Sequence, residues 1–163
     1  MLRIIKIVLV ISVGAWALVG AFGNVIGWEA TIGAVGATTS MATFEGGADD
    51  WRATENPALI LAGAVFILAL KIIAGVLCLA GAWRMVNTRS GDAAAFHKAK
   101  ALALTGCAVA MFMLFMGWIV IAETWFEAWR SDLLREQALQ SAFRYCGMIG
   151  VIALFVGMRD EEA

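Results

Sequence analysis

The chain has few of the residues from which metal and redox centres are built. Its 163 residues include one histidine, one proline and three cysteines. His97 stands alone in a polar segment, so one chain cannot hold a haem between two histidines. Cys78, Cys107 and Cys146 each fall in a different apolar run and form no CxxC pair, so we expect no metal site. We interpret these thiols as small apolar side chains of the core.

The sequence also lacks the short motifs that mark common catalytic sites. It contains no HExxH, no GxSxG and no glycine-rich phosphate loop of the Walker type. Its basic residues form no run or patch of the kind that binds nucleic acid. We therefore predict a protein that is not an enzyme, that needs no cofactor and that has no nucleic-acid partner.

Apolar residues dominate what is present. Hydrophobic residues make up 62% of the chain and charged residues 15%, with a mean hydropathy of +0.84. Soluble domains have roughly 45–50% apolar and about 25% charged residues. Four apolar runs approach the ~20 residues that a membrane-spanning helix needs. The predicted fold is all-α, a four-helix transmembrane bundle in one domain, residues 1–163, with spans at about 4–25, 57–83, 101–122 and 139–158.

The first apolar run is interpreted as a retained span. Arg3 and Lys6 precede it, as basic residues precede the apolar core of a signal peptide. That core is only ~7–15 residues long and is followed by a small-residue cleavage site. The run here is longer, and the sequence at residues 23–25 is a poor cleavage site.

Charge is distributed unevenly between the apolar runs. Residues 24–56 carry five acidic residues and one arginine, whereas residues 84–100 carry four basic residues and one aspartate. Cytoplasmic loops carry the excess of lysine and arginine, so the second segment is predicted to be cytoplasmic and the first to lie outside. Arg3, Lys6 and Arg159 then place both termini in the cytoplasm.

The outer end of the bundle is predicted to carry a cap. The first loop is long, and its small apolar stretch 32–41 is interpreted as flexible chain along the membrane surface. The third helix is predicted to extend beyond its span through Arg130, with Trp125 and Trp129 in the aromatic belt of the interface. Trp51 and Arg52 are then expected to dock against Trp125, Trp129 or Glu127.

Lys71 is the most unusual residue, because it stands near the middle of an apolar run. An unpaired charge at the bilayer centre costs at least ~2.5–3.5 kcal/mol. Small residues recur on its helix face, so the side chain is expected to point into the bundle. No acidic residue lies at its depth. Three alternatives stay open: satisfaction by backbone carbonyls or buried water, a counter-charge from a partner, and a role in transport or ligand binding.

Arg144 is the second charge predicted to be buried in the membrane. With a rise of about 1.5 Å per residue, it lies at a depth similar to that of Glu123. Glu123 and Glu127 are therefore its candidate ion-pair partners, and such a pair would hold the third and fourth spans together. The tail 159–162 is interpreted as a solvated end.

Several of these segments resemble one family. The matching residues are Gly23-Asn24, Met41, Trp51-Arg52 with Pro57-Ala58-Leu59, the segment 75–81, the segment 123–131 and the segment 140–144. The chain resembles the bacterial predicted small integral membrane proteins known as domain of unknown function twenty-one sixty-five. The resemblance implies a four-span protein of the bacterial inner membrane, and it implies no activity.

The leading functional hypothesis is an accessory or assembly subunit of a larger membrane complex. It rests on the missing catalytic groups, the small-residue helix faces and a lysine without a partner in its own chain. The expected partners are the lipid bilayer and other membrane subunits or further copies of the chain. The alternatives are a small oligomeric transporter using Lys71, Arg144 and Glu123, and a module that binds a lipid or a quinone.

Overall fold

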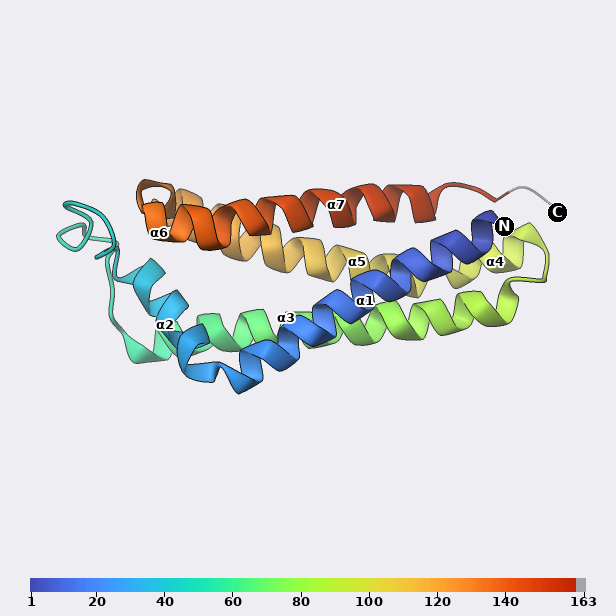
Figure 1. The fold of residues 1–163 in the computed structure, drawn as a ribbon, viewed down its shortest axis with the longest axis horizontal. Helices are drawn as coiled ribbons and strands as arrows, with labels where there is room; N and C mark the ends of the chain where they lie inside the picture. The colour runs from blue at the N-terminus through green and yellow to red at the C-terminus, as the bar shows by residue number, and fades with distance from the viewer. Residues whose placement is uncertain (161–163) are drawn as a thin grey trace.

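Each predicted span is helical in the computed structural model, which describes residues 1–160 (Figure 1). The helical elements are α1 Leu2–Ile26, α2 Trp28–Thr39, α3 Pro57–Thr88, α4 Ala93–Ala99, α5 Ala101–Phe112, η1 Met113–Trp125, η2 Ala128–Arg130, α6 Asp132–Leu134, η3 Arg135–Leu139 and α7 Gln140–Gly157. Within the described residues no strand is present, and four helical stretches are long and apolar enough to cross a membrane. The predicted all-α bundle with four spans is confirmed.

The four spanning stretches pack side by side and give the bundle two distinct ends. The start of α1, helix α4 and the segment after α7 lie at one end, which we call the terminal end (Figure 1). Helix α2, the loop 40–56 and η2 lie at the other, which we call the loop end. Large apolar side chains such as Val19, Phe143 and Leu154 remain at least 70% exposed, as expected of helices that face lipid.

Small residues bring α3 into close contact with both α1 and α5. Gly75 of α3 faces Leu18 of α1, and Gly81 of α3 faces the backbone of Ala103 in α5. A Cβ atom on Gly106 of α5 would lie 2.7 Å from the backbone nitrogen of Cys78. The small face predicted for the second span therefore packs inside its own bundle.

Helix α2 replaces the flexible stretch predicted at residues 32–41. The prediction was wrong because this segment is rich in glycine and alanine and has no strong amphipathic pattern. Its stability comes from packing on α3, since a Cβ atom on Gly63 would lie 2.9 Å from Val35. Helices in proteins owe most of their stability to such contacts.

The third spanning helix ends earlier than predicted. Its last part, η1, is a π-helix, in which the backbone N–H of Phe126 donates to the carbonyl of Ile121 at 3.0 Å. Glu127 follows in the left-handed conformation, with φ 50° and ψ 33°, and this ends the helix. Residues 128–130 form a separate 3₁₀ turn, so the helix does not continue through Arg130. The second span also differs from its prediction at its C-terminal end, because α3 continues beyond residue 83 to Thr88.

The close packing of α3 against α5 makes Gly106 intolerant of a side chain. We expect Gly106→Ala to reduce the free energy of unfolding by about 1–3 kcal/mol, the usual penalty of overpacking a core. Gly147→Ala on α7 is the matched control, because nothing lies within 4 Å of the added methyl group. Thermal unfolding in a mild detergent, followed by circular dichroism, measures both. Equal stability of the two variants would contradict the packing described here.

Candidate functional site

Lys71 finds a partner in its own chain. Its ammonium nitrogen Nζ donates a hydrogen bond of 2.9 Å to the side-chain oxygen Oδ1 of Asn24, near the end of α1. Gly20, one turn earlier on α1, leaves room for the lysine, since a Cβ atom there would lie 3.4 Å from Nζ. Within the chain, the sequence analysis considered acidic side chains, backbone carbonyls and buried water as partners of Lys71, and it passed over this neutral side-chain amide. The ammonium is held in place, but Asn24 brings no negative charge to it.

Two clefts meet at Lys71 and at the indole of Trp118. The first has a volume of about 340 Å³ and opens between α1, α2, α3 and η1. The second has a volume of about 220 Å³ and lies between α1, α3, η1 and the last helical segments, η3 and α7. The polar residues of the two linings are Asn24, Thr31 and Lys71 in the first, and Lys71, Ser141 and Tyr145 in the second. Lys71 is thus only half-buried and lines both clefts.

Aromatic and apolar side chains line the space next to Lys71. Trp118 also lines a third cavity of about 70 Å³ between α2, α3 and η1, whose wall includes Phe66 and Ile121. In the second cleft Trp16 contacts Tyr145, with ring centres 5.3 Å apart. Trp118 belongs to the π-helical segment η1, and π-helical geometry is frequent at functional sites. The arrangement places one cationic hydrogen-bond donor, Lys71, beside aromatic side chains.

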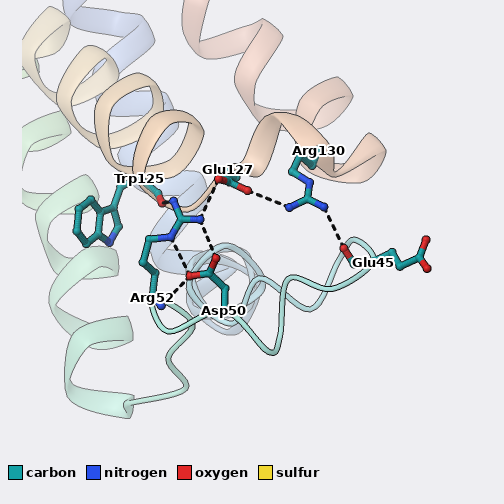
Figure 2. Close-up of polar contacts among 6 residues, drawn as sticks. All are labelled: Glu45, Asp50, Arg52, Trp125, Glu127 and Arg130. Carbon is teal, nitrogen blue, oxygen red and sulfur yellow. Dashed lines mark hydrogen bonds and ion pairs between the residues drawn. The ribbon is translucent and has the colours of Figure 1, made fainter.

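The loop end is closed by a second cluster, centred on Arg52 (Figure 2). The guanidinium nitrogen Nη2 of Arg52 pairs at 2.8 Å with both Asp50 and Glu127. Its Nη1 donates at 2.9 Å to the carbonyl oxygen of Trp125, which the end of the helix leaves free. The structure therefore brings together Arg52, Trp125 and Glu127 across more than seventy residues of sequence.

Further contacts surround this arginine. The ring of Trp51 meets that of Trp125 nearly at right angles, with centres 5.7 Å apart. Arg130 pairs with Glu127 at 3.0 Å and donates to the carbonyl oxygen of Glu45 at 3.2 Å (Figure 2). Trp129, in contrast, points outward and is 54% exposed. Because the helix ends before it, Trp129 does not share a helix face with Trp125.

Arg52 also sets the ionisation of the two carboxyl groups. Hydrogen bonds from Arg52 lower the pKa of Asp50, and they lower that of Glu127 with a further contribution from Arg130. The same bonds raise the pKa of Arg52. The cluster is therefore held together most strongly when both carboxyl groups are ionised.

The predicted pair between Arg144 and Glu123 is not formed in the described residues, and the burial of Arg144 in the membrane stays a prediction. Arg144 is exposed on α7 and donates at 3.1 Å to the hydroxyl of Ser141, one turn earlier. No ion pair within residues 1–160 involves Glu123. A similar depth, as predicted, does not fix the face of the helix from which a side chain leaves. Glu127 pairs with Arg52 and Arg130 instead.

A third cluster, at the terminal end, was missed by the sequence analysis. Asp160 pairs with Lys6 of α1 at 2.9 Å and with Lys100 at the start of α5. Both ammonium groups also donate to the carbonyl oxygen of Met158 at 2.8 Å. All three charged side chains are at most 4% exposed. The prediction of a solvated tail is wrong for Asp160; residues 161 and 162 lie outside the described part of the chain.

The ionisation of Asp160 follows from its two partners. Burial opposes the charged form, but hydrogen bonds from Lys100 and Lys6 outweigh burial and lower the pKa of Asp160. Two buried ammonium groups share this one carboxylate. Counted over the part of the chain that the structure describes, the cluster therefore has two cations for one anion.

Comparison with known proteins identifies the family. Residues 2–159 match the family described as predicted small integral membrane protein (DUF2165). The chain therefore belongs to this family, which confirms the resemblance seen in its sequence segments. No curated protein and no solved structure matches the chain. The family description establishes an integral membrane protein in contact with the lipid bilayer.

The Arg52 cluster makes the stability of the loop end depend on pH. A carboxyl group whose pKa is lowered in the folded state stabilises the fold above its unfolded pKa, near 4, and loses this effect as the pH falls below it. We expect the difference in melting temperature between the wild type and Arg52→Gln to be constant above about pH 5 and to shrink toward pH 2. Arg135→Gln removes an exposed pair with Asp132 and should have little effect at any pH. A difference that did not change with pH would contradict this assignment.

The terminal cluster is expected to respond unequally to the loss of its acid and of its bases. Asp160→Asn leaves two buried ammonium groups without a counter-charge and should reduce the free energy of unfolding by about 3 kcal/mol or more. Lys100→Met leaves the balanced pair of Lys6 and Asp160 and should cost less. The double variant should recover part of the stability lost in Asp160→Asn. Unfolding in urea measures all three; equal losses in the two single variants would rule out the charge excess.

Proposed function

We propose that this member of the small integral membrane protein family is a non-enzymatic protein that binds a lipid-soluble ligand at Lys71. The ligand would carry an oxygen-bearing head group, as a quinone or a lipid does. One observation supports this above all: an ammonium group at the junction of two clefts, held at one point by a neutral amide. A carbonyl or acidic oxygen entering either cleft could accept a hydrogen bond from Nζ.

The walls of the clefts suit the apolar part of such a ligand. Trp118 and Trp16 line the second cleft together with Lys71, and the apolar cavity lined by Phe66 continues from Trp118 toward the loop end. Ligand sites of this kind are mostly apolar, with a few convergent polar groups that fix the orientation. The first cleft, at about 340 Å³, falls in the usual size range of ligand sites.

Transport is the second candidate. It is favoured by the fact that Lys71 and Trp118 line both clefts, so that a ligand could pass from one side of the lysine to the other. The path expected from the sequence ran through Lys71, Arg144 and Glu123. Neither Arg144 nor Glu123 lines the two clefts. A transport path would therefore use Trp118 and Ser141 instead.

An accessory or assembly role in a larger complex stays a prediction. Two of the three sequence features behind it have an explanation within the chain. The small face of α3 packs against α1 and α5, and Lys71 has Asn24 as a partner. We also propose a bacterial inner membrane with both termini in the cytoplasm, because Arg3 and Lys6 lie at the same end of the bundle as the basic segment 84–100.

The proposal predicts that binding depends on the ammonium group of Lys71. A short-chain ubiquinone should quench tryptophan fluorescence of the whole protein in detergent saturably, because Trp16 and Trp118 line the second cleft. Lys71→Met should weaken this binding by about 10-fold or more, since a hydrogen bond from a charged group is worth ~1.5–3 kcal/mol. Lys98→Met, which removes an exposed lysine at the terminal end, is the matched control.

A filled cleft provides an independent check. Gly23 lines the first cleft, and a Cβ atom there would meet nothing within 4 Å, so we expect the side chain of Gly23→Leu to fill part of this cleft. We expect native mass spectrometry to show less co-purified lipid or quinone on Gly23→Leu and Lys71→Met than on wild type. Unchanged quenching and unchanged adducts in both variants would refute a ligand site at Lys71.

A further inference from the structure

The terminal end holds a cleft that is rich in basic residues. It has a volume of about 580 Å³ and is enclosed by the start of α1, the turn after α3 and the segment after α7. Four cationic side chains line it: Arg3, Lys6, Arg89 and Arg159. Among residues 1–160, Asp160 is the one acidic residue in this lining. Such a balance of charge favours an anionic occupant.

The carboxylate of Asp160 is already engaged. Asp160 pairs with Lys6, which lines the cleft, and with Lys100 behind it. One negative charge is therefore shared between two ammonium groups that are almost completely buried. A buried charge without a partner is strongly destabilising. A further anion next to Lys6 would offset the remaining positive charge.

Arg3 is held in an orientation ready to bind. Its Nη1 donates to the carbonyl oxygen of Arg89 at 2.9 Å and to that of Gly91 at 2.6 Å. Its guanidinium also lies over the ring of Phe96, 5.2 Å from the ring centre. A guanidinium fixed in this way loses little conformational freedom when its other N–H groups bind a ligand.

The neighbouring surface is apolar. Leu2 and Ile4 line the same cleft, and they are 61% and 56% exposed. The cleft thus lies where a spanning helix begins, with basic groups on one side and lipid-facing side chains on the other. Basic pockets between spanning helices on the cytoplasmic side are known to take anionic lipid head groups.

We propose that this cleft binds a phosphate group, either as the head group of an anionic phospholipid or as a soluble phosphate. Phosphate suits the site because arginine can bind its oxygens in pairs through parallel N–H groups. Arg3, Arg89 and Arg159 supply the guanidinium groups, and Lys6 supplies a charge at the base of the cleft. The site is separate from Lys71 and does not depend on a ligand there.

The test uses the whole protein in nanodiscs of phosphatidylcholine. Phosphatidylglycerol is added in steps, and bound lipid is counted by native mass spectrometry. We expect saturable binding of phosphatidylglycerol to wild type and binding weaker by about 10-fold in Arg3→Gln/Arg159→Gln. Lys98→Gln is the control, because Lys98 is an exposed base at the same end that does not line the cleft. Arg159→Gln alone serves if the loss of Arg3 impairs folding, since Arg159 is exposed.

A second arm separates the two sources of phosphate. Inorganic phosphate is added to the same nanodiscs, and the melting temperature is followed with and without it. A rise in wild type that is lost in the arginine variants, without preference for phosphatidylglycerol, would support a soluble phosphate ligand. Equal behaviour of wild type, arginine variants and Lys98→Gln in both arms would overturn the proposal.

Discussion

Removing ionisable side chains from water is the constraint on which the arrangement of this bundle depends. A charge in an apolar environment is unfavourable unless protein groups take the place of its hydration. The chain meets this demand with its own groups: Asn24 for Lys71, and Asp160 for Lys6 and Lys100. The first contact ties α1 to α3, and the second ties the segment after α7 to α1 and α5. The polar contacts thus also fix the neighbours of each helix.

Close helix packing provides the setting in which these contacts form. Without side chains at Gly75, Gly81 and Gly106, α1 and α5 approach α3 closely along its length. At Gly20 the same absence leaves space for the lysine stem and, beside it, for the clefts. The candidate site is therefore a place where the packing of α1, α3 and η1 is incomplete next to a cationic donor. At both ends, ionic clusters hold the loop 40–56 and the last described residues in place.

The sequence predicts the spans well because their apolar runs are long and their ends are marked. Asn56 caps α3 through the N–H of Ala58, and Pro57 begins the helix, as expected for that position. Contacts between distant residues are harder to predict. Asp160 and Lys6 are 154 positions apart, and no local pattern links them. The partner of Lys71 was missed for a different reason: a neutral asparagine gives no charge signal, although Asn24 stands out as a polar residue beside an apolar run. The π-helical course of Met113–Trp125, which positions Trp118, has no signal in composition or periodicity.

We propose that Lys71 meets a ligand as well as Asn24. A crystal structure of the protein extracted with its native lipids tests this most directly, because it shows what lies beside Nζ. We expect elongated density in one of the two clefts, with a polar end within hydrogen-bond distance of Lys71 and an apolar part along Trp118. Two results would contradict a ligand at Lys71. The clefts could be closed by side chains, or they could hold ordered water alone around an unchanged contact between Lys71 and Asn24.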